Sequence, residues 1–189
     1  MRGQAYTLEA FVAGLLVLGG VVFSLQATAV TPLSASTSNQ YVGNQERTVA
    51  YGLMGAAKAN GTLQEAVVDW NKSSGRFVGA SADTGVFSNA GPPNAFGRAL
   101  NETFDNEQTA FNVVLRYRGP NDTLARQPMV TMGTPSNDAT VAIRSVVLYD
   151  DTTLTTGGNV TNATFYATDA EPNGPLFNVV EVRMTVWRI

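Results

Sequence analysis

The sequence predicts an α+β fold: a long N-terminal apolar helix followed by a mainly antiparallel β domain with helices packed on one face. Two observations predict this class. The 21 residues from Ala10 to Val30 carry no charge, and as a helix they would span roughly 31 Å, the thickness of a bilayer's hydrocarbon core. The second half of the chain consists of short apolar or alternating runs separated by Gly, Pro and Asn, as in strands and turns. A β-sandwich is the alternative, because two packed sheets would bury both faces of residues 140–149.

The composition argues against several classes of function. Only 14% of the 189 residues are charged, the net charge is −3, and the basic residues are scattered, whereas a nucleic-acid surface needs a clustered basic face. The chain contains no Cys and no His. Disulfides and thiolate chemistry are therefore excluded, and the usual general base and commonest metal ligand are missing. The sequence predicts a non-enzymatic protein with no cofactor and no nucleic-acid partner.

The chain divides into three predicted parts: residues 1–30, a hinge at 31–38 and a domain at 39–189. The apolar run is preceded by Arg2, and the next basic residue is Arg47. Under the positive-inside rule this distribution places the N-terminus in the cytoplasm and the domain outside the cell membrane.

The apolar run has three interpretations. In the first it is a transmembrane helix, with small residues four apart, as at Ala10 and Gly14, that allow helices to approach closely. In the second it is a cleaved secretory signal ending at the A-x-A sequence of residues 27–29. The third depends on a polar start that contains a single acid, Glu9, ahead of the uncharged stretch.

The sequence Arg2-Gly3-Gln4, followed by a few polar residues, Glu9 and the apolar run, resembles the archaeal type IV pilin signal, and the whole chain is similar to haloarchaeal membrane-anchored proteins. The resemblance implies that a prepilin peptidase cuts between Gly3 and Gln4. It also implies that the retained helix packs with its own copies or with other pilins, and that Glu9 sets the register between neighbours. A cut after Gly3 makes Glu9 the sixth residue of the mature chain, one later than in that family.

In the first half of the domain, the patterns favour helices. Thr31-Pro32 predicts a kink or break, because proline lacks an N–H and disfavours helix before it. A second helix is expected over residues 39–59, with an apolar stripe formed by Val42, Val49, Leu53, Met54 and Ala57. Thr62 is expected to cap a further short helix. Residues 71–98 are expected to be mostly loop, with one strand at 76–78, and residues 95–105 to form a helix.

In the second half, the patterns favour strands. Strands are expected at 110–118, 129–132, 140–149, 163–167 and 176–189, with a Gly157-Gly158 turn before the fourth. Residues 140–149 are apolar on both faces, which is typical of a central strand. In the last strand, Val180, Val182, Met184 and Val186 are expected to face the core.

Six Asn-x-Ser/Thr sequons occur where chance would give roughly two or three, and all lie in the part predicted to be outside the cell. They are candidate N-glycosylation sites at Asn60, Asn71, Asn101, Asn121, Asn159 and Asn162. The other explanation is an Asn/Thr-rich surface without sugar.

Two groups of acids were considered as metal or catalytic sites. Neither Asp150-Asp151 nor the group of Glu102, Asp105 and Glu107 has the alternating spacing of a calcium loop. Asp150-Asp151-Thr152 is more typical of a turn closed by side-chain hydrogen bonds.

These features predict a cell-surface structural protein, a pilin-like subunit or minor component that is anchored by its N-terminal helix and located in the membrane or in a surface filament. The alternative is a monomeric surface binding module on an uncleaved single-span helix. A secreted enzyme or lectin, starting at Val30, is a third hypothesis.

Overall fold

The computed structural model describes residues 2–104, 108–161 and 164–189; within the first helix, side chains are described for residues 8–25 and 43–59. The chain forms two compact units, residues 1–44 and 45–189. Helix α1 (Arg2–Ala59) contributes to both: it is the whole described part of the first unit and the first element of the second.

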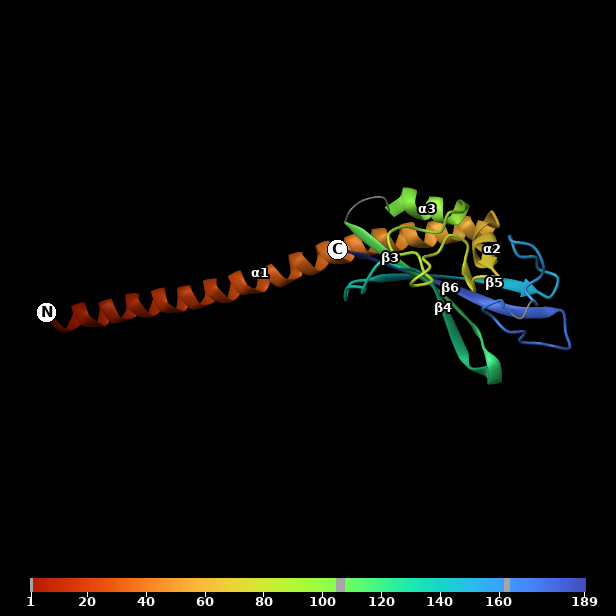
Figure 1. Cartoon of the computed structure of the whole chain (residues 1–189). Helices are drawn as coiled ribbons and strands as arrows, with labels where there is room; N and C mark the ends of the chain where they lie inside the picture. The colour runs from red at the N-terminus through yellow and green to blue at the C-terminus, as the bar shows by residue number, and fades with distance from the viewer. Residues whose placement is uncertain (1, 105–107, 162–163) are drawn as a thin grey trace. The chain divides into compact units, whose positions relative to one another are not determined.

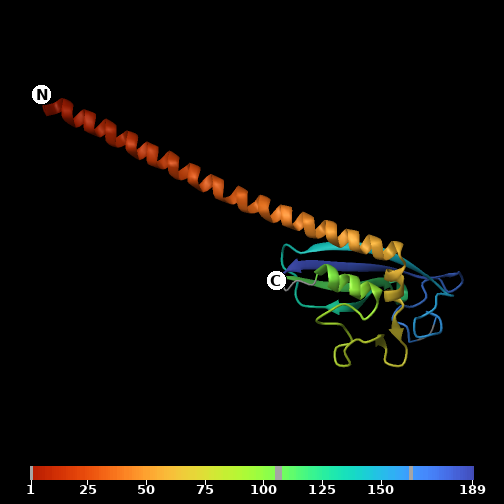
Figure 2. The ribbon, with the colours of Figure 1, turned by 90° about the horizontal axis from the view of Figure 1, so that it is seen from above.

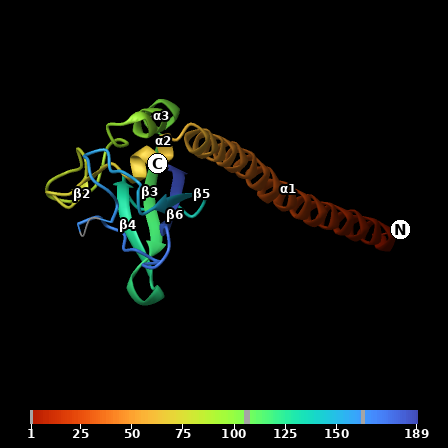
Figure 3. The same ribbon diagram turned by 90° about the vertical axis from the view of Figure 1, so that its right-hand side faces the viewer.

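The second unit contains a four-stranded antiparallel sheet. Its strands are β3 (Thr109–Arg118), β4 (Leu124–Thr131), β5 (Thr140–Tyr149) and β6 (Leu176–Arg188), and their order across the sheet is β4-β3-β6-β5 (Figure 3). Two short strands of two residues each, β1 (Trp70–Asn71) and β2 (Arg76–Phe77), form a separate antiparallel hairpin. The α+β class is therefore confirmed, and the described residues contain no second large sheet of the kind a sandwich needs.

Helices cover one face of the sheet. The C-terminal part of α1, α2 (Thr62–Val67) and α3 (Ala95–Phe104) lie over that face (Figures 1 and 2). Met54, Leu63 and Leu100 of these helices are fully buried, and they belong to one core cluster with inward-facing strand residues such as Val113 and Met184. The prediction that Val180, Val182, Met184 and Val186 face the core is confirmed, because all four are fully buried.

The predicted break at Thr31-Pro32 does not end the helix. α1 continues from Arg2 to Ala59, so residues 31–38 are helical and no separate helix begins at residue 39. Pro32 removes one backbone hydrogen bond, at a cost of about 3 kcal/mol, but the 58-residue helix keeps the backbone hydrogen bonds of the turns before and after the proline.

The buried stripe of α1 in the second unit also differs from the predicted one. It consists of Ala50, Met54 and Ala57. Met54 and Ala57 are buried as predicted and Leu53 is half-buried against the core, whereas Val49 is 40% exposed; Val42 lies outside the described side chains. Gly61, not Thr62, is the N-cap of α2, and the Thr62 hydroxyl donates to the carbonyl of Ala57 at 3.2 Å. The left-handed backbone at Gly61 (φ 77°) suits glycine at this tight helix–helix turn.

Three strand predictions were wrong in detail. β5 is an edge strand and not a central one, and Val147 and Tyr149 on its outer face are about half exposed. β4 begins at Leu124 and passes through Pro128, which an edge strand tolerates because one side of it needs no ladder bond. Residues 164–167 form no strand; Phe165 and Tyr166 pack instead around Trp70.

The remaining element predictions are confirmed within a residue or two. They are α3, β2, β3, β6 and the turn at Gly157-Gly158, where both glycines have positive φ.

Candidate functional site

The first candidate site is the apolar segment of α1. Residues Leu8–Leu25 form a window of 18 residues with a mean hydropathy of 2.2, and none of it is buried in the protein. Its large side chains are open to the surroundings; Phe11, Leu16 and Phe23 are each at least 70% exposed. A helix that is apolar all round needs an apolar environment, which a bilayer or other helices can provide. The segment is therefore compatible with a membrane anchor or with a signal sequence.

The residues predicted for processing and assembly lie at the start of this segment. Gly3 and Gln4 are in the first turns of α1, and their side chains lie outside the described ones. Glu9 is exposed, one residue into the apolar window.

The second candidate site is one end of the sheet, which we call the far end: the end at which β3 and β5 finish and β6 begins. The opposite, near end is marked by an ion pair in which Arg188 Nε donates to Glu46 Oε1 at 2.7 Å. Within the second unit, α1 runs from Glu46 at the near end to Ala59. Half-way along, the carbonyl of Tyr51 accepts a hydrogen bond from Nη2 of Arg144, in the middle of β5, at 3.2 Å. The end of α1 is therefore at the far end, beside α2 (Figure 2), and Asn60 follows it directly in the chain.

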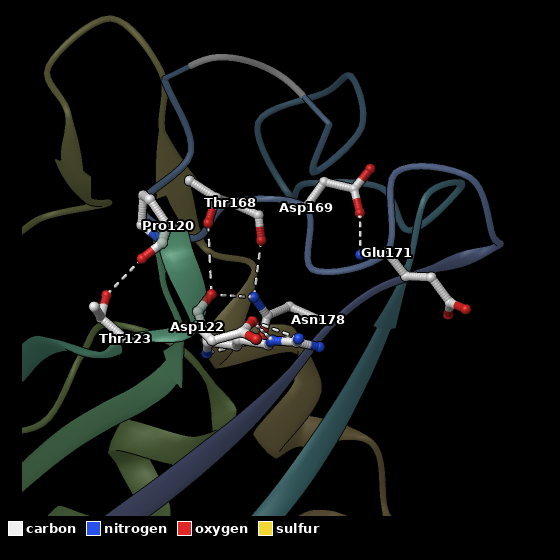
Figure 4. Close-up of polar contacts among 8 residues, drawn as sticks. Pro120, Asp122, Thr123, Thr168, Asp169, Glu171 and Asn178 are labelled. Atoms are coloured by element: carbon white, nitrogen blue, oxygen red, sulfur yellow. Dashed lines mark hydrogen bonds and ion pairs between the residues drawn. The ribbon is translucent and has the colours of Figure 1, made fainter.

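A buried asparagine holds the far end together. Asn178 at the start of β6 is completely buried, and its amide nitrogen donates to the carbonyls of Arg118 and Thr168, both at 2.8 Å. Its amide oxygen accepts from the N–H of Arg118 at 3.2 Å. Figure 4 shows Asn178 directed at Thr168, next to the turn that contains Pro120, Asp122 and Thr123. This side chain ties the loop before β6 to the end of β3, which no sequence pattern had predicted.

The turn between β3 and β4 carries one of the sequons. Residues 120–122 form a short 3-10 turn in which Asn121 (φ 57°) and Asp122 (φ 60°) are both left-handed. Asn and Asp tolerate this conformation better than other side chains. The Thr123 hydroxyl donates to the Pro120 carbonyl at 2.8 Å, and Asp122 pairs with Arg118. The turn is thus fixed at its base while Asn121 is exposed at its tip.

A third polar cluster at the far end joins three segments. The two carboxylate oxygens of Asp69 accept from the Thr155 hydroxyl and from Asn94 Nδ2, the latter at 3.1 Å. The other end of the Asn94 amide accepts from the N–H of Gly97 at 3.0 Å and so caps α3. Every polar atom in this cluster has a structural partner, so we assign it to folding.

The six sequons fall into distinct environments. Asn60, Asn121 and Asn159 are exposed, and among the described residues none of their side chains makes a hydrogen bond. Asn71 and Asn101 are half-buried and engaged. Asn71 Oδ1 accepts from the N–H groups of Ser73 and Ser74, at 2.9 and 3.2 Å, and Asn101 Oδ1 accepts from the N–H of Gly91 at 2.8 Å. Asn162 lies outside the described residues.

In the part of the chain that the structure describes, no three acidic side chains come together. Asp150 and Asp151 occupy a turn after β5, in which the N–H of Tyr149 donates to the Thr152 hydroxyl at 2.8 Å. The predicted turn is therefore confirmed. Of the other group, Glu102 is exposed on α3, and Asp105 and Glu107 lie outside the described residues.

Two tyrosines are perturbed by their surroundings, and both belong to the aromatic core. Burial, followed by the nearby Tyr117, raises the pKa of Tyr166 well above its ordinary value, and burial raises the pKa of Tyr117. Tyr166 donates to the carbonyl of Val67 at 3.1 Å and packs edge-on against Trp70. Both shifts follow from burial in this aromatic core.

Comparison with known proteins identifies a family. A family of unknown function, DUF7288, matches residues 2–186. The chain belongs to this family. The DUF7288 match includes the apolar segment of α1 and most of β6, so it covers nearly all of both units. No curated protein and no solved structure matches the chain.

Proposed function

We propose that this member of the DUF7288 family is a non-enzymatic cell-surface structural protein, a pilin-like subunit or minor pilin-like component. In this proposal α1 anchors the chain in the cell membrane, with the N-terminus in the cytoplasm and residues 45–189 outside, and it packs against copies of itself or other pilins. The observation that carries the proposal is the 18-residue apolar window of α1, of which nothing is buried within the protein.

The second half of α1 supports a structural role. Ala50 and Met54 are completely buried, because they form part of the domain's core. The same helix therefore supplies an apolar segment that is not buried in the protein and residues that pack in the core of the folded domain.

Glu9 supports assembly over a simple anchor. It lies at the front of the apolar window, where a carboxylate that enters a bilayer is costly unless it has a partner. The free ammonium of a neighbour's mature N-terminus, created by a prepilin peptidase cut between Gly3 and Gln4, would supply such a partner. The pairing would fix the register of adjacent helices.

A monomeric surface binding module on an uncleaved helix is the second candidate. The same apolar window favours it, because anchoring requires no partner helix. In that case Glu9 lies at the membrane interface, outside the hydrocarbon region.

Mass spectrometry of the native protein, combined with electron microscopy of its surface preparations, distinguishes the two. A mature chain that starts at Gln4 and is found in filaments supports the pilin-like subunit. A chain that starts at Met1 and dissolves in detergent as a monomer supports the simple anchor, and a start at Val30 contradicts both.

The registry role of Glu9 has its own test. Glu9→Ala should reduce the yield of filaments at least several-fold while the protein stays in the membrane. Glu65→Ala removes an exposed acid on α2 and serves as the control, with no effect on assembly. Unchanged assembly of Glu9→Ala would contradict the registry role.

A further inference from the structure

We infer that the protein is N-glycosylated at the far end of its domain, at Asn60, Asn121 and Asn159, and that the sequons at Asn71 and Asn101 remain unmodified. The inference rests on the proposed location of residues 45–189 outside the cell. It goes beyond the sequence motif, which treats all six asparagines alike, because the structure separates them by what their side-chain amides do.

The chemistry requires an accessible amide nitrogen. Nδ2 attacks C1 of a sugar carried on a lipid-linked phosphate; the N–C1 bond forms, the C1–O bond to the phosphate breaks, and Nδ2 loses a proton as the phosphate departs with the bonding electrons. The acceptor amide must therefore reach an external glycosyltransferase, and the sugar must then fit in solvent. A sequon on a surface loop meets both conditions.

Three sequons satisfy these conditions. Asn60 follows the last residue of α1, Asn121 is the tip of the β3–β4 turn, and Asn159 lies in the loop after Gly157-Gly158. All three are exposed, and no hydrogen bond of their side chains occurs among the described residues. A glycan on any of them would displace no contact that holds the fold together.

Two sequons fail the conditions. Asn101 is inside helix α3, and its amide oxygen holds the N–H of Gly91. Asn71 is half-buried in β1 and closes the β1–β2 turn through its amide oxygen. Each of these asparagines has a structural task that fixes its amide against the protein.

The three accessible sequons are not spread evenly over the domain. Asn121 lies just after the end of β3, and Asn60 lies beside α2. Asn159 lies in a loop that is attached next to α2, because the N–H of Thr155 in that loop donates to the carbonyl of Val68 at 3.3 Å. All of these positions belong to the far end of the sheet, opposite the Glu46–Arg188 ion pair. Sugars placed there would keep this end in solvent and leave the near end and the open face of the sheet for contacts with other molecules.

Glycopeptide mass spectrometry on the full-length protein, purified from its native membrane, tests the inference. All test chains carry Asn162→Asp, so that peptides covering residues 152–164 report on Asn159 alone. Asn60→Asp, Asn121→Asp and Asn159→Asp should each remove the mass of one glycan. Asn71→Asp and Asn101→Asp serve as matched controls, because aspartate keeps the oxygen acceptor that each position needs, and they should leave the mass of the glycans unchanged.

Two kinds of result would contradict these proposals. Glycan on Asn71 or Asn101, or its absence from all three far-end sites in a chain that protease reaches from outside the cell, would overturn the inference and leave the proposed function standing. A chain that is unmodified and also protected inside the cell would instead contradict the proposed location.

Discussion

At the scale of single residues, Asn178 is the polar side chain on which the far end of the domain depends most. It is fully buried, and its amide satisfies three backbone groups at once. Buried backbone groups that lose a partner cost about 1–3 kcal/mol each. Asn178 lies among apolar residues on the buried face of β6, and the hydrogen bonds that it makes to the loop before β6 and to the end of β3 explain why an asparagine occupies this position.

Asn178→Leu should lower the free energy of unfolding by about 3 kcal/mol, because Leu fills similar space but leaves the Arg118 and Thr168 groups unpaired. Chemical denaturation of the full chain in detergent, followed by tryptophan fluorescence, measures the change. Asn173→Leu, at an exposed position in the same loop, is the control and should change stability by less than about 0.5 kcal/mol. Equal effects of the two variants would show that the hydrogen bonds of Asn178 contribute little.

Tyr166 predicts how stability depends on pH. Its pKa is raised in the folded protein, so the proton is held there after unfolded tyrosines, with a pKa near 10.0, have lost theirs. The stabilisation is complete below about pH 10 and is lost progressively as the pH rises from there towards the folded pKa. Melting temperatures measured from pH 8 to 12 should therefore fall above pH 10. Tyr166→Phe should flatten that decline, with the remainder due to Tyr117, and an unchanged decline would contradict the assignment.

At the scale of elements, α3 shows why a helix-favouring substitution can damage a helix. A Cβ on Gly97 would lie 1.8 Å from the carbonyl oxygen of Pro92, whereas a Cβ on Gly52 of α1 would meet nothing within 4 Å. The first glycine is required by the close approach of the loop before α3. The second is simply a weak helix former at an exposed position.

The two glycines make a matched pair of substitutions. Gly97→Ala should destabilise the protein by about 3 kcal/mol, since backbone must move to admit the methyl group. Gly52→Ala should stabilise it by about 0.5–1 kcal/mol through helix propensity. Thermal unfolding monitored by circular dichroism gives both values. A stabilising Gly97→Ala would mean that the contact between residues 92 and 97 is not tight.

The core face of α1 provides a further test at this scale. Met54→Ala should cost about 2–5 kcal/mol, because it opens a cavity at a fully buried site between α1 and the sheet. Lys58→Ala, one turn later and exposed, should cost less than about 0.5 kcal/mol. Both are measured by the same denaturation experiment. Similar costs for the two would argue that this part of α1 is not packed on the domain.

The elements show where sequence patterns suffice and where they do not. Alternation in residues 176–189 predicted β6 and its buried face, because the strand has one solvated side. Residues 140–149 are apolar on both faces, yet β5 is at an edge, because the pattern records hydrophobicity and not the pairing order. Proline usually interrupts regular structure, but α1 continues through Pro32 and the edge strand β4 continues through Pro128.

The candidate sites were predictable to a similar extent. The apolar segment and the sequons follow from local composition, which needs no knowledge of the fold. The division of those sequons into free and engaged asparagines does not, because it depends on partners such as Gly91 that sit ten residues from Asn101. The role of Asn178 depends on Arg118, 60 residues away, and no local pattern contains that information.

At the scale of the whole molecule, the two units have complementary properties. The first presents an apolar helix with no cover of its own, and the second is a folded α+β domain with its own core. These properties are suited to a protein whose apolar helix lies in a membrane or among other helices and whose folded domain lies outside it. The proposed surface role depends on that division more than on any single residue.

Protease treatment of intact cells is the measurement that tests this account most directly. The account predicts that a protease added outside digests an epitope placed after Ile189, while the apolar part of α1 stays with the membrane fraction. Digestion only after the cells are broken open, or recovery of the whole chain in the soluble fraction, would contradict it.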